Sequence, residues 1–318
     1  MAESFGSSLT AVAGYRPGKA VTNDDLAPRT TVTPDWIVER TGIQSRYHSA
    51  PDEDITTMAA EAGRKALAMA QLDNGDVDLL ILATATRRQR MPGGAPQVAT
   101  KIGLPVAGAF DLNAVCAGFT YALAMASNAV RTGDAKHVLV IGAERTSEWI
   151  NPQTPDTFVI FGDGAGAAVV SRSDEENIGP AVWGSDGTRA GVLGMTEFGP
   201  GEEYVTMDGP LVYKWSTAKI PPVAKRACER AGVSLSDVDW LVPHQANRRI
   251  IDTLARTLEF PDDRVARDVV DTGNTSAASV PLALSRLYES GRMLPGDRVL
   301  LLGFGAGLTY SGQVIRMP

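Results

Sequence analysis

The chain is poor in cysteine and histidine, which limits the chemistry that it can carry. Its 318 residues include two cysteines, Cys116 and Cys228, and three histidines. Two thiols in a chain of this length do not make a disulfide framework. No set of cysteine and histidine residues has the spacing of metal ligands, so we predict neither a metal nor another resident cofactor.

The sequence also lacks an excess of positive charge and any long apolar run. A formal net charge of −7 argues against non-specific binding to nucleic acid, although a local basic patch remains compatible with an acidic protein partner. Apolar runs such as Leu79–Ala83 are far shorter than the ~20 residues that span a bilayer. The first ten residues show no signal peptide. We therefore expect a soluble cytoplasmic protein with no nucleic-acid or membrane partner.

An internal repeat is present instead. At an offset of 161 residues, Asp76–Asp78 corresponds to Asp237–Asp239, and His137–Gly142 corresponds to Arg298–Gly303. Two similar helix–strand units, which are common in α/β proteins, are the alternative explanation. We favour an ancient duplication of one half of the chain.

Each half is predicted to hold a helix, a short apolar strand, a helix rich in small residues and a nearly continuous apolar strand. The expected ranges are 58–70, 79–83, 116–130 and 138–141, then 218–231, 240–242, 276–288 and 299–302. Strands without polar alternation are usually buried on both faces, so helices must lie outside and between the two sheets. We predict a duplicated five-layer α/β/α/β/α sandwich with pseudo-twofold symmetry, divided into residues 1–173 and 174–318.

Cys116 is the candidate nucleophile. It lies in DLNAVCAGFTYALAMA, where an apolar run gives way to an Ala- and Leu-rich helix. The N–H groups of a helix N-terminus stabilise a thiolate, so we expect a lowered pKa and a binding site for an oxyanion. A small buried cysteine in a packed turn is the alternative. Cys228, on a helix, is expected to be structural.

His244 and Asn274 are the candidate partners of this cysteine. His244 follows an apolar strand, whereas His48 lies in a polar segment expected to be solvated and His137 opens a strand. Asn274 precedes a helix and alone would be interpreted as a cap. The repeat places Cys116 opposite Ala277, in the junction that holds Asn274, so the three side chains are expected to converge.

Two glycine clusters, 162–166 and 303–307, resemble nucleotide-binding loops only superficially. Neither has the full spacing of a dinucleotide or phosphate-binding loop. We expect close backbone packing, or N–H groups presented to a ligand, at both places.

Several longer motifs identify a family resemblance over nearly the whole chain. They are TPDWIVERTGI (33–43), CAGFTYAL (116–123), FGDGAGAA (161–168), VPHQANRRI (242–250), GNTSAAS (273–279) and GFGAGLTY (303–310). The sequence resembles the β-ketoacyl-[acyl-carrier-protein] synthase III enzymes of the thiolase-like superfamily. That resemblance implies the duplicated five-layer fold, a homodimer and an acyltransferase that uses acyl-CoA and malonyl-acyl-carrier protein to initiate fatty-acid synthesis.

The resemblance also implies roles for individual residues. Cys116 would carry the acyl group, His244 and Asn274 would stabilise the enolate formed by loss of CO2, and the N–H groups of Cys116 and Ala306 would form an oxyanion hole. The implied CoA and pantetheine contacts are Trp36, Arg40, Gly209, Asn247 and Phe304. The implied acyl pocket comprises Ile160, Phe161, Leu193 and Met91 (the last reaching into the partner subunit), and the carrier-protein contacts are Lys214, Arg249 and Arg256.

One departure from the family pattern concerns the first substrate. Many members place an arginine opposite the tryptophan that stacks on adenine, and Pro155 takes that place here. Proline supplies no guanidinium, which weakens the expected CoA contact. The sequence leaves open the primer and whether CoA or a carrier protein delivers it. It also leaves open a priming ketosynthase or acyltransferase of polyketide metabolism and, from another class, a cysteine thioester hydrolase.

Overall fold

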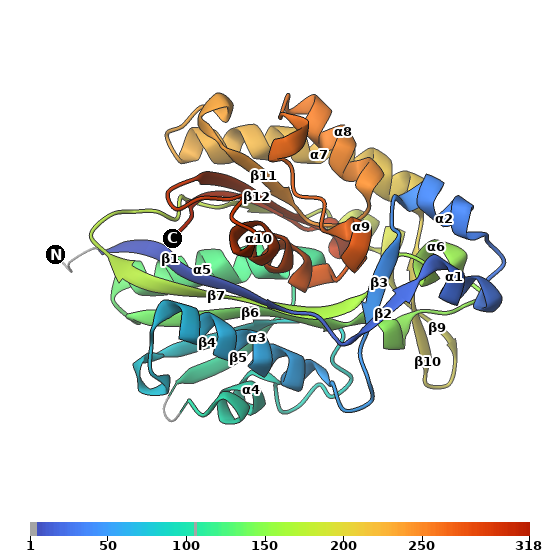
Figure 1. Ribbon diagram of the computed structural model, residues 1–318, viewed down its shortest axis with the longest axis horizontal. Helices are drawn as coiled ribbons and strands as arrows, with labels where there is room; N and C mark the ends of the chain where they lie inside the picture. The colour runs from blue at the N-terminus through green and yellow to red at the C-terminus, as the bar shows by residue number, and fades with distance from the viewer. Residues whose placement is uncertain (1–4, 105–106) are drawn as a thin grey trace.

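The computed structural model describes residues 5–104 and 107–318. Within them, two sheets form the framework (Figure 1). The strand order of the first sheet is β1 (Gly6–Tyr15), β7 (Asp163–Ser173), β6 (His137–Arg145), β4 (Leu79–Ala83) and β5 (Gly108–Leu112). That of the second is β11 (Trp240–Pro243), β12 (Arg298–Phe304), β13 (Tyr310–Arg316) and β8 (Val182–Gly184). The first sheet thus comes from residues before the expected junction of the halves, and the second from residues after it.

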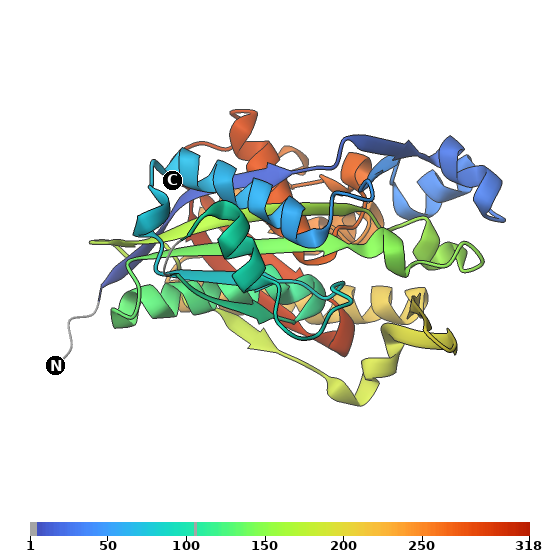
Figure 2. The ribbon, with the colours of Figure 1, turned by 90° about the horizontal axis from the view of Figure 1, so that it is seen from below.

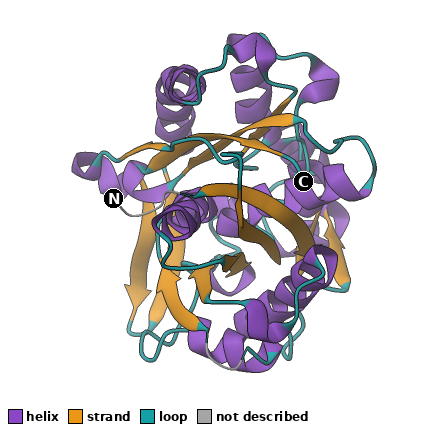
Figure 3. Cartoon of the chain, turned by 90° about the vertical axis from the view of Figure 1, so that its left-hand side faces the viewer, coloured by secondary structure: helices purple, strands orange, loops and turns teal. Residues whose placement is uncertain are grey.

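Helices separate and cover the two sheets, as Figures 1 and 3 show. Helices α5 (Gly118–Thr132) and α10 (Ser279–Glu289) pack between the sheets in one apolar cluster. Helices α3 (Ile55–Ala70) and α4 (Ala95–Ile102) cover the outer face of the first sheet. Helices α7 (Gly209–Arg230) and α8 (Arg248–Thr257) cover the outer face of the second. The predicted five-layer sandwich is confirmed.

The repeat seen in the sequence recurs in the strand register and the hydrogen bonds. Strand β4 pairs with β6 so that Leu79 faces Val138, and β11 pairs with β12 so that Trp240 faces Val299. Before each strand an aspartate accepts a backbone hydrogen bond: Asp78 from the N–H of His137 at 3.0 Å, and Asp239 from that of Arg298 at 2.8 Å. Each residue named in the first half lies 161 positions before its counterpart in the second half.

Close packing in the middle layer explains the glycine-rich segments. A Cβ atom added to Gly142 on β6 would lie 2.4 Å from the carbonyl oxygen of Ala277, and one on Gly166 would lie 2.7 Å from Pro281. Real Cβ atoms do not approach so closely, so at these two positions the strands can come this near to the loop and helix of the other half only because a side chain is missing. The expectation of close backbone packing in the 162–166 cluster is confirmed.

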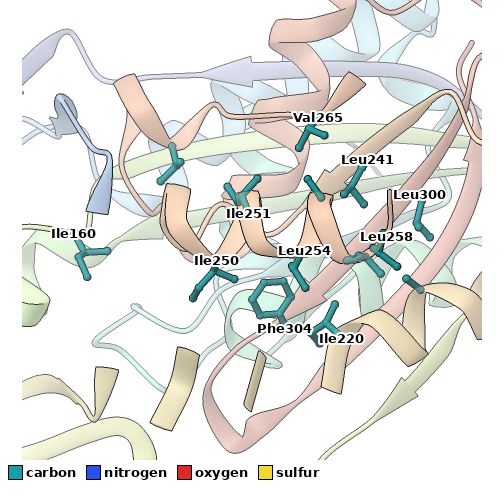
Figure 4. Packing of buried hydrophobic residues seen from close by; sticks show 14 of the residues in the cluster. Ile160, Ile220, Leu241, Ile250, Ile251, Leu254, Leu258, Val265, Leu300 and Phe304 are labelled. Carbon is teal, nitrogen blue, oxygen red and sulfur yellow. The ribbon is translucent and has the colours of Figure 1, made fainter. Parts of the chain in front are cut away.

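The outer face of the second sheet is closed by the apolar side of α8. Ile250 and Leu254 of this helix point toward Phe304 of β12 and Ile220 of α7 (Figure 4). At ~25 cal/mol per Å² of buried apolar surface, each fully buried aliphatic side chain stabilises the fold by roughly 1.5–3 kcal/mol. This packing fixes the position of the chain that leads from β11 into α8.

Smaller elements gather at one end of the sandwich (Figure 2). They are β2 (Lys19–Thr22), β3 (Ser45–His48), α1 (Asn23–Leu26), α2 (Pro34–Thr41), α6 (Pro155–Phe158), α9 (Val269–Thr272) and the hairpin of β9 (Leu193–Gly199) with β10 (Glu202–Met207). Among the described residues, none of the helices combines the length and apolar character needed to span a membrane.

Two local expectations were wrong. Helix α7 begins at Gly209 rather than near residue 218, because Asp208 caps it by accepting the N–H of Leu211. The helix then continues through Pro221 and Pro222. His48 is not a solvated loop residue. It ends β3, and burial lowers the pKa of its imidazole.

Candidate active site

The nucleophile and its counterpart in the second half lie in matching turns. A short 3-10 turn, Val115–Ala117, carries Cys116 into α5, and the turn Ser276–Ala278 leads into α10. Val115 has a φ of 47° and Ser276 a φ of 48°, a left-handed conformation that is uncommon for residues other than glycine. The two turns share this geometry at equivalent positions of the repeat, and they pack against each other.

Burial controls the ionisation of Cys116. The residue is 5% exposed, and removal from water raises the pKa of its thiol to about 12. The Ser276 hydroxyl and the N–H groups of Cys116 and Ala306 oppose this effect, while Glu144 adds to it. The expected lowering of the pKa is therefore wrong, because desolvation outweighs the helix N-terminus. Burial thus favours the thiol over the thiolate.

Two N–H groups surround this sulfur. Those of Cys116 and Ala306 both favour its charged form, which places donors where an oxyanion would develop beside the thiol. A Cβ atom on Gly305 would lie 2.6 Å from the Cβ of Cys116. Position 305 must therefore be a glycine, because a residue with a Cβ atom would not let the backbone before Ala306 come this close to the nucleophile.

His244 is held as a neutral hydrogen-bond donor. Its backbone N–H donates to the carbonyl of Leu302 at 2.6 Å, and burial lowers the pKa of its imidazole to about 3. Nδ1 lies 2.7 Å from Oγ of Ser279, which also accepts the N–H of Gln245 at 3.3 Å. Because Ser279 accepts from Gln245, its own hydroxyl proton is available to Nδ1. When Ser279 donates that proton to Nδ1, the imidazole proton resides on Nε2.

Asn274 is fixed in the same way. Its N–H donates to the carbonyl of Ile160 at 2.9 Å, and its carbonyl accepts the N–H of Gly162 at 3.0 Å. The side-chain oxygen Oδ1 accepts the N–H of Ser276 at 2.9 Å. With Oδ1 engaged, the Nδ2 amide group is the end of this side chain that can donate to a ligand.

Cys116, His244 and Asn274 line one cavity of about 260 Å³, so the predicted convergence is found. Phe304 packs edge-on to the His244 ring, with the ring centroids 5.3 Å apart. Ala306 also lines the cavity. The remaining wall is mainly apolar and contains Ile160, Phe161, Leu193, Met195, Val205, Met207, Val212, Trp215 and Ile250.

A second hollow of about 460 Å³ continues from this cavity toward the surface. Both are lined by Ile160, Met207, Gly209 and Asn247, which marks their connection. The outer hollow is also lined by Trp36, Arg40, Asp156, Tyr213 and Arg249, together with Thr41, Val159 and Pro210. The guanidinium of Arg40 lies 5.8 Å from the Trp36 ring, and that of Arg249 lies 5.7 Å from Tyr213.

Other residues predicted for the site lie outside these two hollows. Met91 is 85% exposed on the loop before α4 and does not line the cavity of its own chain. Lys214 faces a separate hollow beside α7, and the Arg256 guanidinium donates to Thr253 on α8. Pro155 begins α6 without lining the outer hollow, whereas its neighbour Asp156 does line it.

Three residues of the site were not singled out in the sequence. Ser276 and Ser279 occur in the GNTSAAS motif, of which only Asn274 was predicted to take part in the chemistry, and Glu144 ends the apolar run of β6. An acidic residue at the end of a buried strand was the available signal for Glu144. Among the described residues, no cluster of histidine, cysteine and acidic side chains could hold a metal ion.

Comparison with known protein families bears on both halves of the chain. Residues 228–317 match the model of the 3-oxoacyl-[acyl-carrier-protein] synthase III C-terminal region, and residues 110–187 match the model named for 3-oxoacyl-[acyl-carrier-protein] synthase III. The first match contains His244 and Asn274, and the second contains Cys116.

Similar proteins cover almost the full length. β-Ketoacyl-[acyl-carrier-protein] synthase III 4 of Streptomyces coelicolor is 46% identical over 98% of this chain and 99% of its own. The priming β-ketosynthase of the R1128 polyketide biosynthetic pathway has a TM-score of 0.97 and 42% identity, covering 100% of this chain and 98% of its own. The 3-oxoacyl-(acyl carrier protein) synthase III of Pseudomonas aeruginosa has a TM-score of 0.93 and 36% identity, covering 98% of each chain.

Proposed function

The chain belongs to the β-ketoacyl-[acyl-carrier-protein] synthase III family, and from this premise we propose that it condenses an acyl primer with malonyl-acyl-carrier protein. The products are a 3-oxoacyl-carrier protein, CO2 and the thiol that delivered the primer, which is CoA when the primer is an acyl-CoA. The observation that carries this proposal is the meeting of Cys116, His244 and Asn274 in one cavity that is otherwise mainly apolar.

In the first step Sγ of Cys116 attacks the thioester carbon of the primer. A bond forms between this sulfur and the acyl carbon, and the carrier thiol leaves with a proton. The charge that develops on the carbonyl oxygen is received by the N–H groups of Cys116 and Ala306, which already favour negative charge at this place. Covalent capture divides one difficult transfer into two easier ones.

In the second step the malonyl thioester loses CO2, and the resulting enolate attacks the acyl group on Cys116. Nε2–H of His244 and Nδ2–H of Asn274 donate hydrogen bonds to the thioester oxygen, where negative charge develops. Loss of CO2 creates the carbanion, so no base has to remove a carbon-bound proton. A histidine whose pKa burial lowers to about 3 suits this role, since it stays neutral and donates.

The two connected hollows divide the substrate between them. The apolar cavity, with Ile160, Phe161 and Leu193 in its wall, receives the acyl chain. Gly209, Asn247 and Phe304 border the pantetheine arm, and Trp36 and Arg40 face the nucleotide end of CoA.

The further assignments concern partners and location. In a cytoplasmic homodimer, Met91 reaches the acyl pocket of the partner subunit. Arg249, at the mouth of the hollow, together with Lys214 and Arg256 contacts the acidic carrier protein.

The decisive assay supplies purified protein with acetyl-CoA and malonyl-carrier protein. We expect CO2 release coupled one-to-one to a 3-oxoacyl-carrier protein. Free acid released without CO2 would instead identify a thioester hydrolase, in which His244 acts as a base toward water.

A second candidate within the family is a priming ketosynthase of a specialised polyketide pathway. Two observations favour this candidate: the similarity to the R1128 priming β-ketosynthase, and the acidic residue Asp156 in the lining of the outer hollow, next to Pro155 at the start of α6. A panel of primers of different length and branching, each offered on CoA and on a carrier protein and compared by kcat/KM, separates the two. Preference for acetyl-CoA supports the fatty-acid enzyme, and preference for a longer or carrier-bound primer supports the polyketide enzyme.

A further inference from the structure

Glu144 is a fully buried acid that the condensation steps above do not use. It lies on β6 with an exposure of 0%, and no lysine or arginine forms an ion pair with it among the described residues. Arg145, the next residue, turns its guanidinium to Glu148 at 3.1 Å and to the carbonyl of Ala50. A buried carboxyl group without a cation is costly, so its presence beside a nucleophile points to a function.

The surroundings of Glu144 suit a carboxylate. The backbone N–H groups of Ala85 and Thr86 donate to it at 3.1 Å, and the Thr86 hydroxyl donates at 2.6 Å. Backbone N–H groups can only donate, so both oxygens act as acceptors. Burial raises the pKa of the group while these hydrogen bonds oppose the effect. The site therefore holds a carboxylate that gains a proton more readily than an exposed one does.

Ser276 lies between this carboxylate and the cavity of the nucleophile. Its hydroxyl donates to Oε1 of Glu144 at 3.0 Å, and Ser276 lines the same cavity as Cys116, in the turn that packs against the Cys116 turn. Cys116 is a titratable group close enough for the Glu144 carboxylate to raise the pKa of its thiol. His244, with its Nδ1 engaged by Ser279 and a pKa lowered to about 3, is a poor acceptor for a thiol proton.

We propose that Ser276 and Glu144 form a proton relay that removes the thiol proton of Cys116 during acyl transfer. As Sγ forms its bond to the acyl carbon, its proton moves to Oγ of Ser276, and the Ser276 hydroxyl proton moves to Oε1 of Glu144. When the carbon–sulfur bond to the carrier breaks, the same two transfers run in reverse and protonate the leaving thiolate. No proton is gained or lost overall. The inference deepens the acylation step of the proposed function and rests on it.

The test measures acylation of Cys116 by acetyl-CoA in single turnovers, followed by intact-protein mass spectrometry from about pH 6 to about pH 9. In the wild-type protein the rate is expected to be level while Glu144 is ionised and to fall where acid protonates it, at a higher pH than for an exposed carboxylate. In Ser276→Ala and in Glu144→Gln we expect a ~10²-fold slower reaction near neutral pH, and a rate that climbs about tenfold per pH unit as the thiolate fraction grows. The double variant is expected to be no slower than the slower single variant, because both residues act in one path.

The matched control is Thr84→Val. The Thr84 hydroxyl also donates to Glu144, at 3.1 Å, but on the oxygen away from Ser276. This variant is expected to keep the wild-type shape of the pH profile. A substitution that acts only by disturbing the structure of the site should likewise leave that shape unchanged. A folded Ser276→Ala or Glu144→Gln variant that keeps that shape, or a fully additive double variant, overturns the relay.

The failure of the relay is distinguishable from that of the proposed function. A wild-type protein that takes up no acyl group contradicts the function itself. Alkylation of Cys116 by iodoacetamide then replaces acylation in the same comparison of variants and pH. There too an unchanged pH profile in the Ser276→Ala variant overturns the relay.

Discussion

The hydroxyl oxygen of Ser279 lies 2.7 Å from Nδ1 of His244, and a proton donated in this contact leaves Nε2 as the end of the imidazole that donates to a ligand. Ser279 is the first residue of α10, and Gln245 donates its N–H to the same oxygen. A side chain on the middle-layer helix thereby sets the tautomer of a residue that follows β11.

Replacing Ser279 by alanine is expected to slow condensation and spare acylation. Without the proton from Ser279, His244 is free to place its own proton on Nδ1, and Nε2 then ceases to donate to the enolate. We expect a drop of ~10–10² in the rate of CO2 release, with the rate of acyl-enzyme formation unchanged. The matched control is Ser285→Ala, which removes a hydroxyl that bonds Glu289 on the same helix. Equal losses in both half-reactions would contradict the tautomer role.

Changing Asn274 to aspartate tests the second donor. The aspartate can still accept the N–H of Ser276, as Oδ1 does at 2.9 Å, but it replaces the amide donor by a negative oxygen facing the developing enolate. We expect malonyl decarboxylation to fall by ~10²–10³ or more. The measurement is release of labelled CO2 from malonyl-carrier protein. A variant with nearly normal decarboxylation would remove Asn274 from the enolate site.

The two cysteines offer a direct test of covalent catalysis. Incubation with acetyl-CoA should add one acetyl group to the wild-type protein and to Cys228→Ala, and none to Cys116→Ser. Cys228 lies buried on α7, where burial raises the pKa of its thiol to about 11, so it is expected to stay unmodified. Intact-protein and peptide mass spectrometry read out the site. Acetylation that persists in Cys116→Ser would contradict the assignment of the nucleophile.

The buried imidazole of His244 is expected to make the fold sensitive to acid. Its pKa falls from 6.5 to about 3 on folding, so below 6.5 the unfolded chain binds the proton and the folded chain does not. Above pH 6.5 this difference in pKa has no effect on stability. As the pH drops from 6.5 toward 3, it lowers the free energy of unfolding progressively. Near pH 4.5 it amounts to roughly 2–3 kcal/mol.

The measurement compares urea unfolding of the wild-type protein and His244→Asn near neutral pH and near pH 4.5. The variant lacks the titrating ring, so it should lose less stability on acidification. Carboxylates shared by both proteins cancel in this comparison. Identical losses in the two proteins would show that His244 does not titrate in this range.

Two charged residues at the mouth of the cavity are expected to change the KM for acetyl-CoA. Asp156 and Arg40 both line the outer hollow, where the phosphates of CoA would lie. Asp156→Asn should lower the KM for acetyl-CoA several-fold and Arg40→Ala should raise it, each by about 1 kcal/mol or less because the sites are open to solvent. The matched substrate is the acetyl thioester of N-acetylcysteamine, which carries no phosphate. Equal changes with both substrates would contradict a phosphate contact.

The sequence by itself determined the architecture. The apolar runs at β4, β6, β11 and β12 and the 161-residue repeat gave the layers and their symmetry, since burial on both faces of a strand leaves a local pattern. It also supplied Cys116, His244 and Asn274, because each follows a predicted strand or precedes a predicted helix. The family motifs then connected these three residues to one chemistry.

Only the tertiary structure decided how these groups are held and charged. Ser279 is 35 positions from His244, and Ser276 is 132 positions from Glu144, so no local pattern joins either pair. The pKa of Cys116 moved opposite to the expectation, because a helix N-terminus is visible in sequence whereas exclusion of water depends on every surrounding layer. Donor geometry and desolvation are properties of the assembled centre, and they set the protonation states on which the reaction depends.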